Sequence, residues 1–251
     1  MVRPMKNRAV ICTHHKTGTV WMDSVFLAIA TAIRVPYVKP SPKDTAWALP
    51  TSACFVRDMH SQWFAKASPE NGDRVLHVIR DPRDVVISAM HYHRASVEKW
   101  LHRPEDRFGG KTYQQALNSL PDDKSRMLFE MDHSSAETIS GMCAWKYSRP
   151  ECFETKYETL LTNGTDEFPK AAKHLGLTGG EIDVAVSAFL ANSLAGGAKR
   201  SAAHPGHIRS GAAKQWRDVF DDDLARAFMT RFPDALPLLG YEPFNACETV
   251  A

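Results

Sequence analysis

Short runs of consecutive apolar residues alternate with longer segments whose apolar positions recur at about the helical period. Three runs, at residues 9–13, 54–56 and 75–79, are typical of strands buried on both faces of a parallel sheet. A fourth strand is predicted over residues 153–157. Helices are predicted over residues 17–33, from residue 83 onward, and over residues 137–147, 167–175, 181–194 and 222–232. This alternation predicts an α/β fold with a central parallel sheet flanked by helices.

Two polar segments interrupt that alternation, at residues 94–132 and 195–210. Both are predicted to be long loops over a site, and disorder is the alternative for the second. Ligands of such sheets bind at the carboxyl ends of the strands. The residues that follow the predicted strands are therefore the candidates for a functional site.

Composition narrows the class of protein. With 251 residues, of which 43% are hydrophobic, the chain suits one globular domain over residues 1–251. A net charge of +2 does not indicate a nucleic-acid partner. The five cysteines form no C-x-x-C pair, so neither a disulfide framework nor a metal site is predicted. No apolar run approaches the roughly 20 residues of a membrane span, and a cytoplasmic location is expected.

The turn after the first predicted strand has the features of an anion-binding loop. Lys16 contributes a positive charge, Thr17 and Thr19 contribute hydroxyl donors, and Gly18 lets the backbone approach an anion closely. The helix that follows adds unpaired amides at its N-terminus. An ordinary helix start with an incidental lysine is one alternative. The phosphate loop of a small-metabolite kinase is another, although the pattern G-x-x-x-x-G-K-[ST] is absent.

A second basic element ends the third apolar run. The guanidinium of Arg80 can hold a phosphate with paired hydrogen bonds. Asp81 and the proline after it predict a helix start, and Ser88 lies two turns into that helix. Arg83 and Asp84 are expected to pair with each other. A plain capped helix is the alternative for the whole element.

These two elements resemble those of sulfotransferases that use 3′-phosphoadenosine 5′-phosphosulfate (PAPS). Lys-Thr-Gly-Thr-x-Trp is similar to the family's 5′-phosphosulfate loop, and Arg-Asp-Pro-Arg-Asp with a later serine is similar to its 3′-phosphate element. Where the family often has Tyr-Pro before the lysine, this chain has His14 and His15. The resemblance runs from about Val10 to Tyr241. It implies a P-loop-like three-layer fold and a single sulfotransferase domain.

The resemblance also implies which residues bind PAPS. They are Lys16, Thr17, Gly18, Thr19, Val20, Trp21, Arg80, Ser88, Tyr157, Arg209, Ser210 and Gly211. Lys16 to Thr19 would hold the 5′-phosphate and sulfuryl group, and Trp21 and Tyr157 would lie beside the adenine. Val20 and Ser210 depart from the family, which often has threonine and lysine there.

Transfer of a sulfuryl group needs an in-line approach, charge stabilisation on the leaving side and a base on the acceptor side. Lys16 is the candidate for the leaving side. By the resemblance, His60 after the second strand is the base, because a neutral imidazole can take a hydroxyl proton. Asp58 either orients His60 or is itself the base. No metal is required.

The acceptor is expected to be a hydroxyl of a small molecule or glycan, with an amine as the second choice. Large aromatic residues are candidates for an apolar acceptor pocket, and core packing explains them equally well; they are Trp47, Trp63, Phe64 and Trp100. A non-catalytic nucleotide-binding protein on the same fold stays open. So does a homodimer, although Asp221 and Asp222 stand where the family's dimer segment has Thr-Val.

Overall fold

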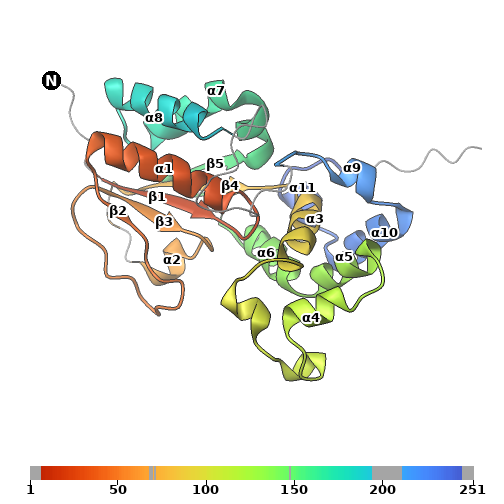
Figure 1. The fold of residues 1–251 in the computed structure, drawn as a ribbon. Helices are drawn as coiled ribbons and strands as arrows, with labels where there is room; N and C mark the ends of the chain where they lie inside the picture. Colours follow the sequence, from red (N-terminus) through yellow and green to blue (C-terminus); the bar gives the residue numbers. More distant parts are fainter. Residues whose placement is uncertain (1–6, 68–69, 71, 147, 194–210, 245–251) are drawn as a thin grey trace, which may run out of the picture. The chain divides into compact units, whose positions relative to one another are not determined.

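The computed structural model describes residues 7–67, 70, 72–146, 148–193 and 211–244. The chain divides into two compact units, each described here by itself (Figure 1). The first unit comprises Met1–Arg80 and Trp145–Ala213, and the second comprises Asp81–Ala144 and Lys214–Ala251. In the described ranges, no helix has both the length and the apolar character needed to cross a membrane.

The first unit is built on a parallel sheet, as predicted, and the sheet has five strands where four were predicted. Its strands are β1 (Arg8–Thr13), β2 (Tyr37–Val38), β3 (Cys54–Asp58), β4 (Arg74–Ile79) and β5 (Cys152–Lys156), in the order β2-β3-β1-β4-β5. Its register places Cys12 opposite both Asp58 and His77, and His77 opposite Glu154. Four groups that can carry or share a proton thus lie in one row across the strands.

Helices α1 (Thr19–Ile33), α7 (Tyr157–His174) and α8 (Gly180–Ala191) cover one face of the sheet (Figure 1). The short helix α2 (Trp63–Lys66) belongs to the opposite face. Each face has its own apolar cluster, which explains why the strands are apolar on consecutive positions. Trp47 and Trp63 belong to the second cluster, so core packing accounts for them.

The second unit contains only helices in its described part. They are α3 (Pro82–His93), η1 (Lys99–His102), η2 (Asp106–Phe108), α4 (Tyr113–Asn118), α5 (Asp123–Asp132), α6 (Ser134–Cys143), α9 (Trp216–Val219), α10 (Asp222–Arg231) and α11 (Ala235–Leu238). Trp100 packs against a small core of Leu101, Tyr113 and Leu117 in this unit.

The prediction of a long loop over residues 94–132 was wrong, because two α-helices and two short 3-10 helices lie there. Thr112 caps α4 in a capping box with Gln115, and Asp122 caps α5 by accepting from the Ser125 amide. One of the buried positions of α5 is Glu130, which pairs with His93 at 2.7 Å. Because Glu130 is charged and occupies a core position, the buried positions of α5 do not appear as a regular series of apolar residues in the sequence.

The expected pair between Arg83 and Asp84 was also wrong. Arg83 is fully buried and donates to both carboxylate oxygens of Asp81, at 2.9 and 2.8 Å. Its guanidinium lies 3.4 Å from the ring centroid of Trp216. Asp84 instead accepts from the Trp216 amide at 3.0 Å. Both charges thus stabilise the start of α3 and the segment around Trp216.

Candidate active site

The loop between β1 and α1 folds around one carbonyl group. The carbonyl oxygen of His14 accepts from the Thr17 amide at 3.1 Å and from the hydroxyls of Thr17 and Thr19, both at 3.0 Å. The His14 amide donates to the Thr17 hydroxyl at 2.8 Å. The Thr17 hydroxyl, fully buried, therefore shapes the loop rather than pointing out of it.

Two residues of this loop have left-handed backbone conformations. Lys16 has a φ of 65°, which is strained for a residue with a side chain. Gly18 has a φ of 104°, and a Cβ atom built there would lie 3.1 Å from the Tyr157 ring. Glycine is thus needed at this position for both its backbone freedom and the close approach of Tyr157. α1 begins at Thr19 with no capping side chain, so its N-terminus can receive an anion.

Arg80 joins the ends of β1 and β4. Its guanidinium donates to the carbonyl oxygen of Lys16 at 3.2 Å and to that of Ala212 at 3.1 Å. It also lies over the Tyr157 ring, 4.4 Å from the centroid. The Tyr157 hydroxyl donates to the carbonyl oxygen of Gly211 at 2.7 Å. Four of the residues predicted to bind PAPS therefore lie together in the first unit.

Trp21 packs beneath them. Its ring is 4% exposed and meets Tyr157 edge-on, with the ring centroids 5.5 Å apart. Phe189 covers it on another side at 5.4 Å. Tyr157 begins α7 rather than ending a strand, as the sequence had predicted. Trp21 and Tyr157 thus form one aromatic wall behind the phosphate loop.

The predicted base lies in the turn after β3. His60 is exposed, while Asp58 is 1% exposed. The Asp58 carboxylate accepts from the His60 amide at 3.2 Å and from the Trp63 amide at 2.6 Å. Burial raises the pKa of Asp58, and these backbone hydrogen bonds oppose the shift. Because both oxygens of Asp58 hold the turn, His60 has the better access to an acceptor.

The His60 turn is tied to the phosphate loop. The Ser61 hydroxyl donates to the carbonyl oxygen of Thr13, the last residue of β1, at 3.0 Å. His60 also lies close enough to His14 to lower the pKa of His14 electrostatically, after the larger effects of burial and His77. The candidate base and the candidate phosphate loop therefore share the carboxyl edge of the sheet.

The remaining predicted residues lie elsewhere. Val20 is a partly exposed residue in the first turn of α1. Ser88 is partly exposed on α3, in the second unit. Arg209 and Ser210 fall outside the described residues. The second unit also contains His93, which is fully buried against Glu130.

Sequence reasoning missed three polar side chains behind the loop: His14, His77 and Glu154. They form a hydrogen-bonded chain, with 2.9 Å between the Nε2 atoms of His14 and His77 and 2.9 Å between His77 Nδ1 and Glu154 Oε2. A histidine in the middle of an otherwise apolar strand was the available signal for His77. For His14 the signal was its place where the resembled family often has tyrosine.

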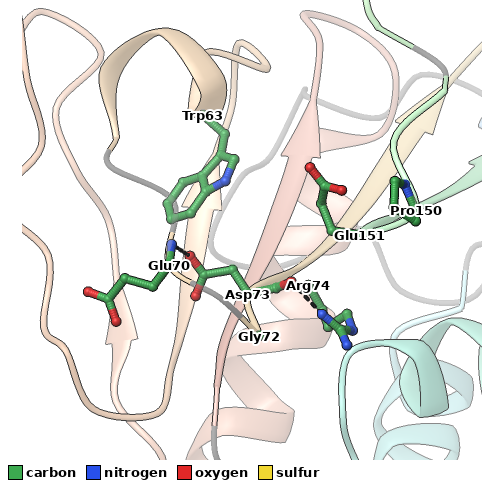
Figure 2. A pocket seen from close by; sticks show the side chains of 7 residues that line it. All are labelled: Trp63, Glu70, Gly72, Asp73, Arg74, Pro150 and Glu151. Carbon is green, nitrogen blue, oxygen red and sulfur yellow. Dashed lines mark hydrogen bonds between the residues drawn. The ribbon is translucent and has the colours of Figure 1, made fainter.

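A pocket of about 430 Å³ lies at the other end of the sheet. Figure 2 shows its lining, which is Trp63, Glu70, Gly72, Asp73, Arg74, Pro150 and Glu151. Arg74 begins β4, so this pocket is at the amino end of a strand whose carboxyl end leads to Arg80. Asp73 accepts from the Glu70 amide at 2.7 Å and pairs with the buried Arg8 at 2.6 Å. The pocket is thus separate from the phosphate loop.

Comparison with known proteins gives a match over nearly the whole chain. The family model described as a sulfotransferase domain matches residues 6–239, which includes parts of both units. No curated protein sequence matches the chain.

Solved structures with the same fold include a mouse sulfotransferase complexed with PAP, at 15% identity. Its TM-score is 0.61, over 94% of this chain and 85% of that one. Retinol dehydratase in complex with androsterone and inactive cofactor PAP is 15% identical, with a TM-score of 0.57, over 91% of this chain and 80% of that one. Retinol dehydratase in a complex with retinol and PAP is 15% identical, with a TM-score of 0.54, over 94% of this chain and 82% of that one. These likenesses confirm the predicted P-loop-like α/β fold.

Proposed function

Because the chain belongs to the sulfotransferase family, we propose that it transfers a sulfuryl group from PAPS to an acceptor hydroxyl. One observation carries the proposal: Arg80 donates to the backbone carbonyls of Lys16 and Ala212 beside Tyr157, so the two cationic residues that follow β1 and β4 lie at the same edge of the sheet. A bisphosphorylated nucleotide has an anion at each end, and this edge offers a cation for each. The family match extends into both units, which supports one catalytic domain over residues 1–251.

The residues of the edge fit the nucleotide. Lys16 and the N-terminus of α1 would hold the 5′-phosphate side, with Gly18 leaving room for the backbone to approach it. Arg80 would hold the 3′-phosphate through paired hydrogen bonds. Ser88, Arg209 and Ser210 are proposed as further contacts, by resemblance alone. The solved structures that contain PAP, which remains after PAPS has given up its sulfuryl group, support this choice of donor.

PAPS supplies an activated sulfuryl group, and two side chains of this chain would act on its transfer. The Lys16 ammonium would stabilise negative charge that develops on the leaving oxygen. His60 would take the proton of the acceptor hydroxyl, since its imidazole is exposed at the same edge of the sheet. Asp58 would act through His60, because its carboxylate already binds the His60 and Trp63 amides.

The acceptor is proposed to be a small-molecule or glycan hydroxyl, with an amine as the second choice. Two structures of the same fold contain PAP together with retinol or androsterone, which supports a small molecule. An alcohol proton is far too weakly acidic to leave unaided, so a hydroxyl acceptor gains most from a base such as His60.

The His60→Ala substitution tests these roles. We expect kcat to fall by about 10²–10⁴, the contribution of a general base, while the Kd for PAP changes less than about threefold, under 0.7 kcal/mol. The control is His102→Ala, which removes another exposed histidine, on η1 of the second unit. A His60→Ala enzyme with normal kcat would refute the base assignment. An equal loss of PAP affinity would make His60 a binding residue.

A further inference from the structure

The chain of His14, His77 and Glu154 extends inward from the phosphate loop across the sheet. His77 is fully buried in the middle of β4 and stacks on Trp145, with ring centroids 4.0 Å apart. It is hydrogen-bonded to His14 on one side and to Glu154 on the other, each at 2.9 Å. The Glu154 side chain is 31% exposed, on the edge strand β5. One end of the chain therefore meets solvent and the other end is part of the phosphate loop.

Burial decides which of the three groups can titrate near neutral pH. It lowers the pKa of His77 to about 3, and it also lowers the pKa of His14 well below its usual value. Both imidazoles are therefore neutral at pH 7. Burial raises the pKa of Glu154 to about 7, and the nearby Lys156 opposes that shift. Glu154 is thus the group whose charge changes in the physiological range.

The groups that face this chain come from several elements. Within the described residues, Glu154 faces His77 from β4, and Lys156 and Cys152 from its own strand. His14 is influenced by His77 and His60. Of these neighbours, Lys156 acts on the pKa of Glu154, and it opposes the rise caused by burial.

The order of the hydrogen bonds couples Glu154 to His14. When Glu154 is ionised, it accepts from His77 Nδ1–H, so His77 Nε2 carries a lone pair and His14 Nε2–H must donate to it. When the pair of Glu154 and His77 holds one more proton, either on His77 or on the Glu154 Oε2 that faces it, His77 Nε2–H donates instead. Neutral His14 then carries its hydrogen on Nδ1. One proton at the sheet edge therefore switches the tautomer of a residue in the phosphate loop.

We propose that Glu154 is a positioning residue that acts through His77 to set the tautomer of His14, and that its ionised form supports sulfuryl transfer. The inference rests on the proposed function, with His60 as the base. His60 becomes positive when it takes the hydroxyl proton, and it lies within electrostatic reach of His14. Ionised Glu154 gives the hydrogen-bonded chain a negative charge, and it leaves His14 Nδ1 unprotonated, as a hydrogen-bond acceptor. Both effects stabilise the positive charge on His60.

The first experiment needs no PAPS. In protein labelled with ¹⁵N-histidine, the Nε2 signals of His14 and His77 should exchange their protonated and unprotonated shifts, with a midpoint near pH 7. His14→Gln assigns the signals. Glu154→Gln should abolish the change, because its amide keeps a hydrogen bond to His77 without an ionisation. Glu151→Gln is the matched control, since Glu151 is also 31% exposed and lies next to β5. A wild-type protein with no change between pH 5.5 and 8.5 overturns the inference.

The second experiment measures kcat/KM against pH. His60 must lose a proton for transfer, and loss of a proton from Glu154 raises the rate further by about tenfold, so the acid limb of the wild-type and Glu151→Gln enzymes should be steeper than a slope of one near pH 7. Glu154→Gln should give a slope of one and a plateau lowered by about tenfold, roughly the effect of one charge at partly screened distance. An unchanged slope in Glu154→Gln refutes the positioning role. If His14 and His77 switch tautomers as expected but the protein transfers no sulfuryl group, the result would count against the proposed function instead.

Discussion

The Arg80→Ala substitution separates two roles of one guanidinium. Arg80 is 5% exposed, donates to the carbonyl oxygens of Lys16 and Ala212, and lies over the Tyr157 ring. Those contacts shape the site for any adenine nucleotide. A grip on a 3′-phosphate matters only when the nucleotide carries that phosphate. Comparing PAP with adenosine 5′-phosphate, which lacks it, therefore isolates the second role.

The size of the effect follows from the hydrogen bonds that the phosphate loses. A paired, charge-assisted hydrogen bond between guanidinium and phosphate contributes about 2–3 kcal/mol, which is roughly 30- to 150-fold in Kd. Loss of the contacts to Lys16 and Ala212 weakens both nucleotides alike and cancels in the ratio of their Kd changes. Arg80→Lys keeps the charge but loses the planar fork, so its ratio should be about tenfold.

Isothermal titration of both nucleotides into the wild-type, Arg80→Ala and Arg80→Lys proteins measures that ratio. Arg74→Ala is the matched control, because Arg74 begins the same strand at its opposite end and should leave both Kd values unchanged. Urea unfolding of each variant checks that the fold is intact. Equal losses for the two nucleotides in Arg80→Ala would remove Arg80 from the 3′-phosphate site.

Three other predictions follow from the same edge of the sheet. Gly18→Ala should cost about 1–2 kcal/mol of unfolding free energy and weaken PAP binding, because φ is 104° and a Cβ would lie 3.1 Å from Tyr157; unchanged values would contradict the close approach. Asp58→Asn should raise KM, or lower kcat by a smaller factor than His60→Ala does, because Asp58 orients the turn; a loss of kcat larger than that of His60→Ala would make Asp58 the base. Stability should fall on acidification from pH 6 to pH 5 by about 1.4 kcal/mol, as measured by chemical denaturation. Between those values the unfolded protein holds protons on His14 and His77 that the folded protein lacks, while folded Glu154, with its raised pKa, holds one that the unfolded protein lacks, so the net difference is about one proton; a flat profile would contradict the neutral buried histidines.

Much of the first unit could be predicted from the chain itself. The strands around Val10, Phe55 and Leu76 are buried on both faces, so consecutive apolar residues mark them clearly. Arg80 and Lys16 were found because both follow such strands, where parallel sheets bind their ligands. β2 was missed, since a strand of two residues leaves no periodic signal.

The second unit was harder to predict because its core contains charges. Arg83 is fully buried, pairs with Asp81 two positions before it and packs on Trp216, which is far away in sequence; the sequence did not indicate that Asp81 rather than Asp84 would be its partner. Glu130 can occupy a core position of α5 because it pairs with His93, which is distant in sequence. Tertiary contacts of this sort satisfy buried charges in ways that spacing along the chain does not reveal.

The hydrogen-bonded chain behind the loop was missed for a related reason. His14 and Glu154 are separated by 140 positions; the register of β4 and β5 places His77 opposite Glu154, and the loop after β1 brings His14 to the other nitrogen of His77. Sequence spacing could indicate that His77 interrupts an apolar strand. It could not indicate which groups His77 would meet.

Transfer of labelled sulfur from PAPS to a panel of phenols, aliphatic alcohols, sugars and amines is the most direct measurement of the proposed activity. The wild-type protein should label at least one hydroxyl compound, and the His60→Ala protein should bind PAP yet label none at a comparable rate. A wild-type protein that binds PAP but labels no member of the panel would contradict the account, as would undiminished transfer by His60→Ala.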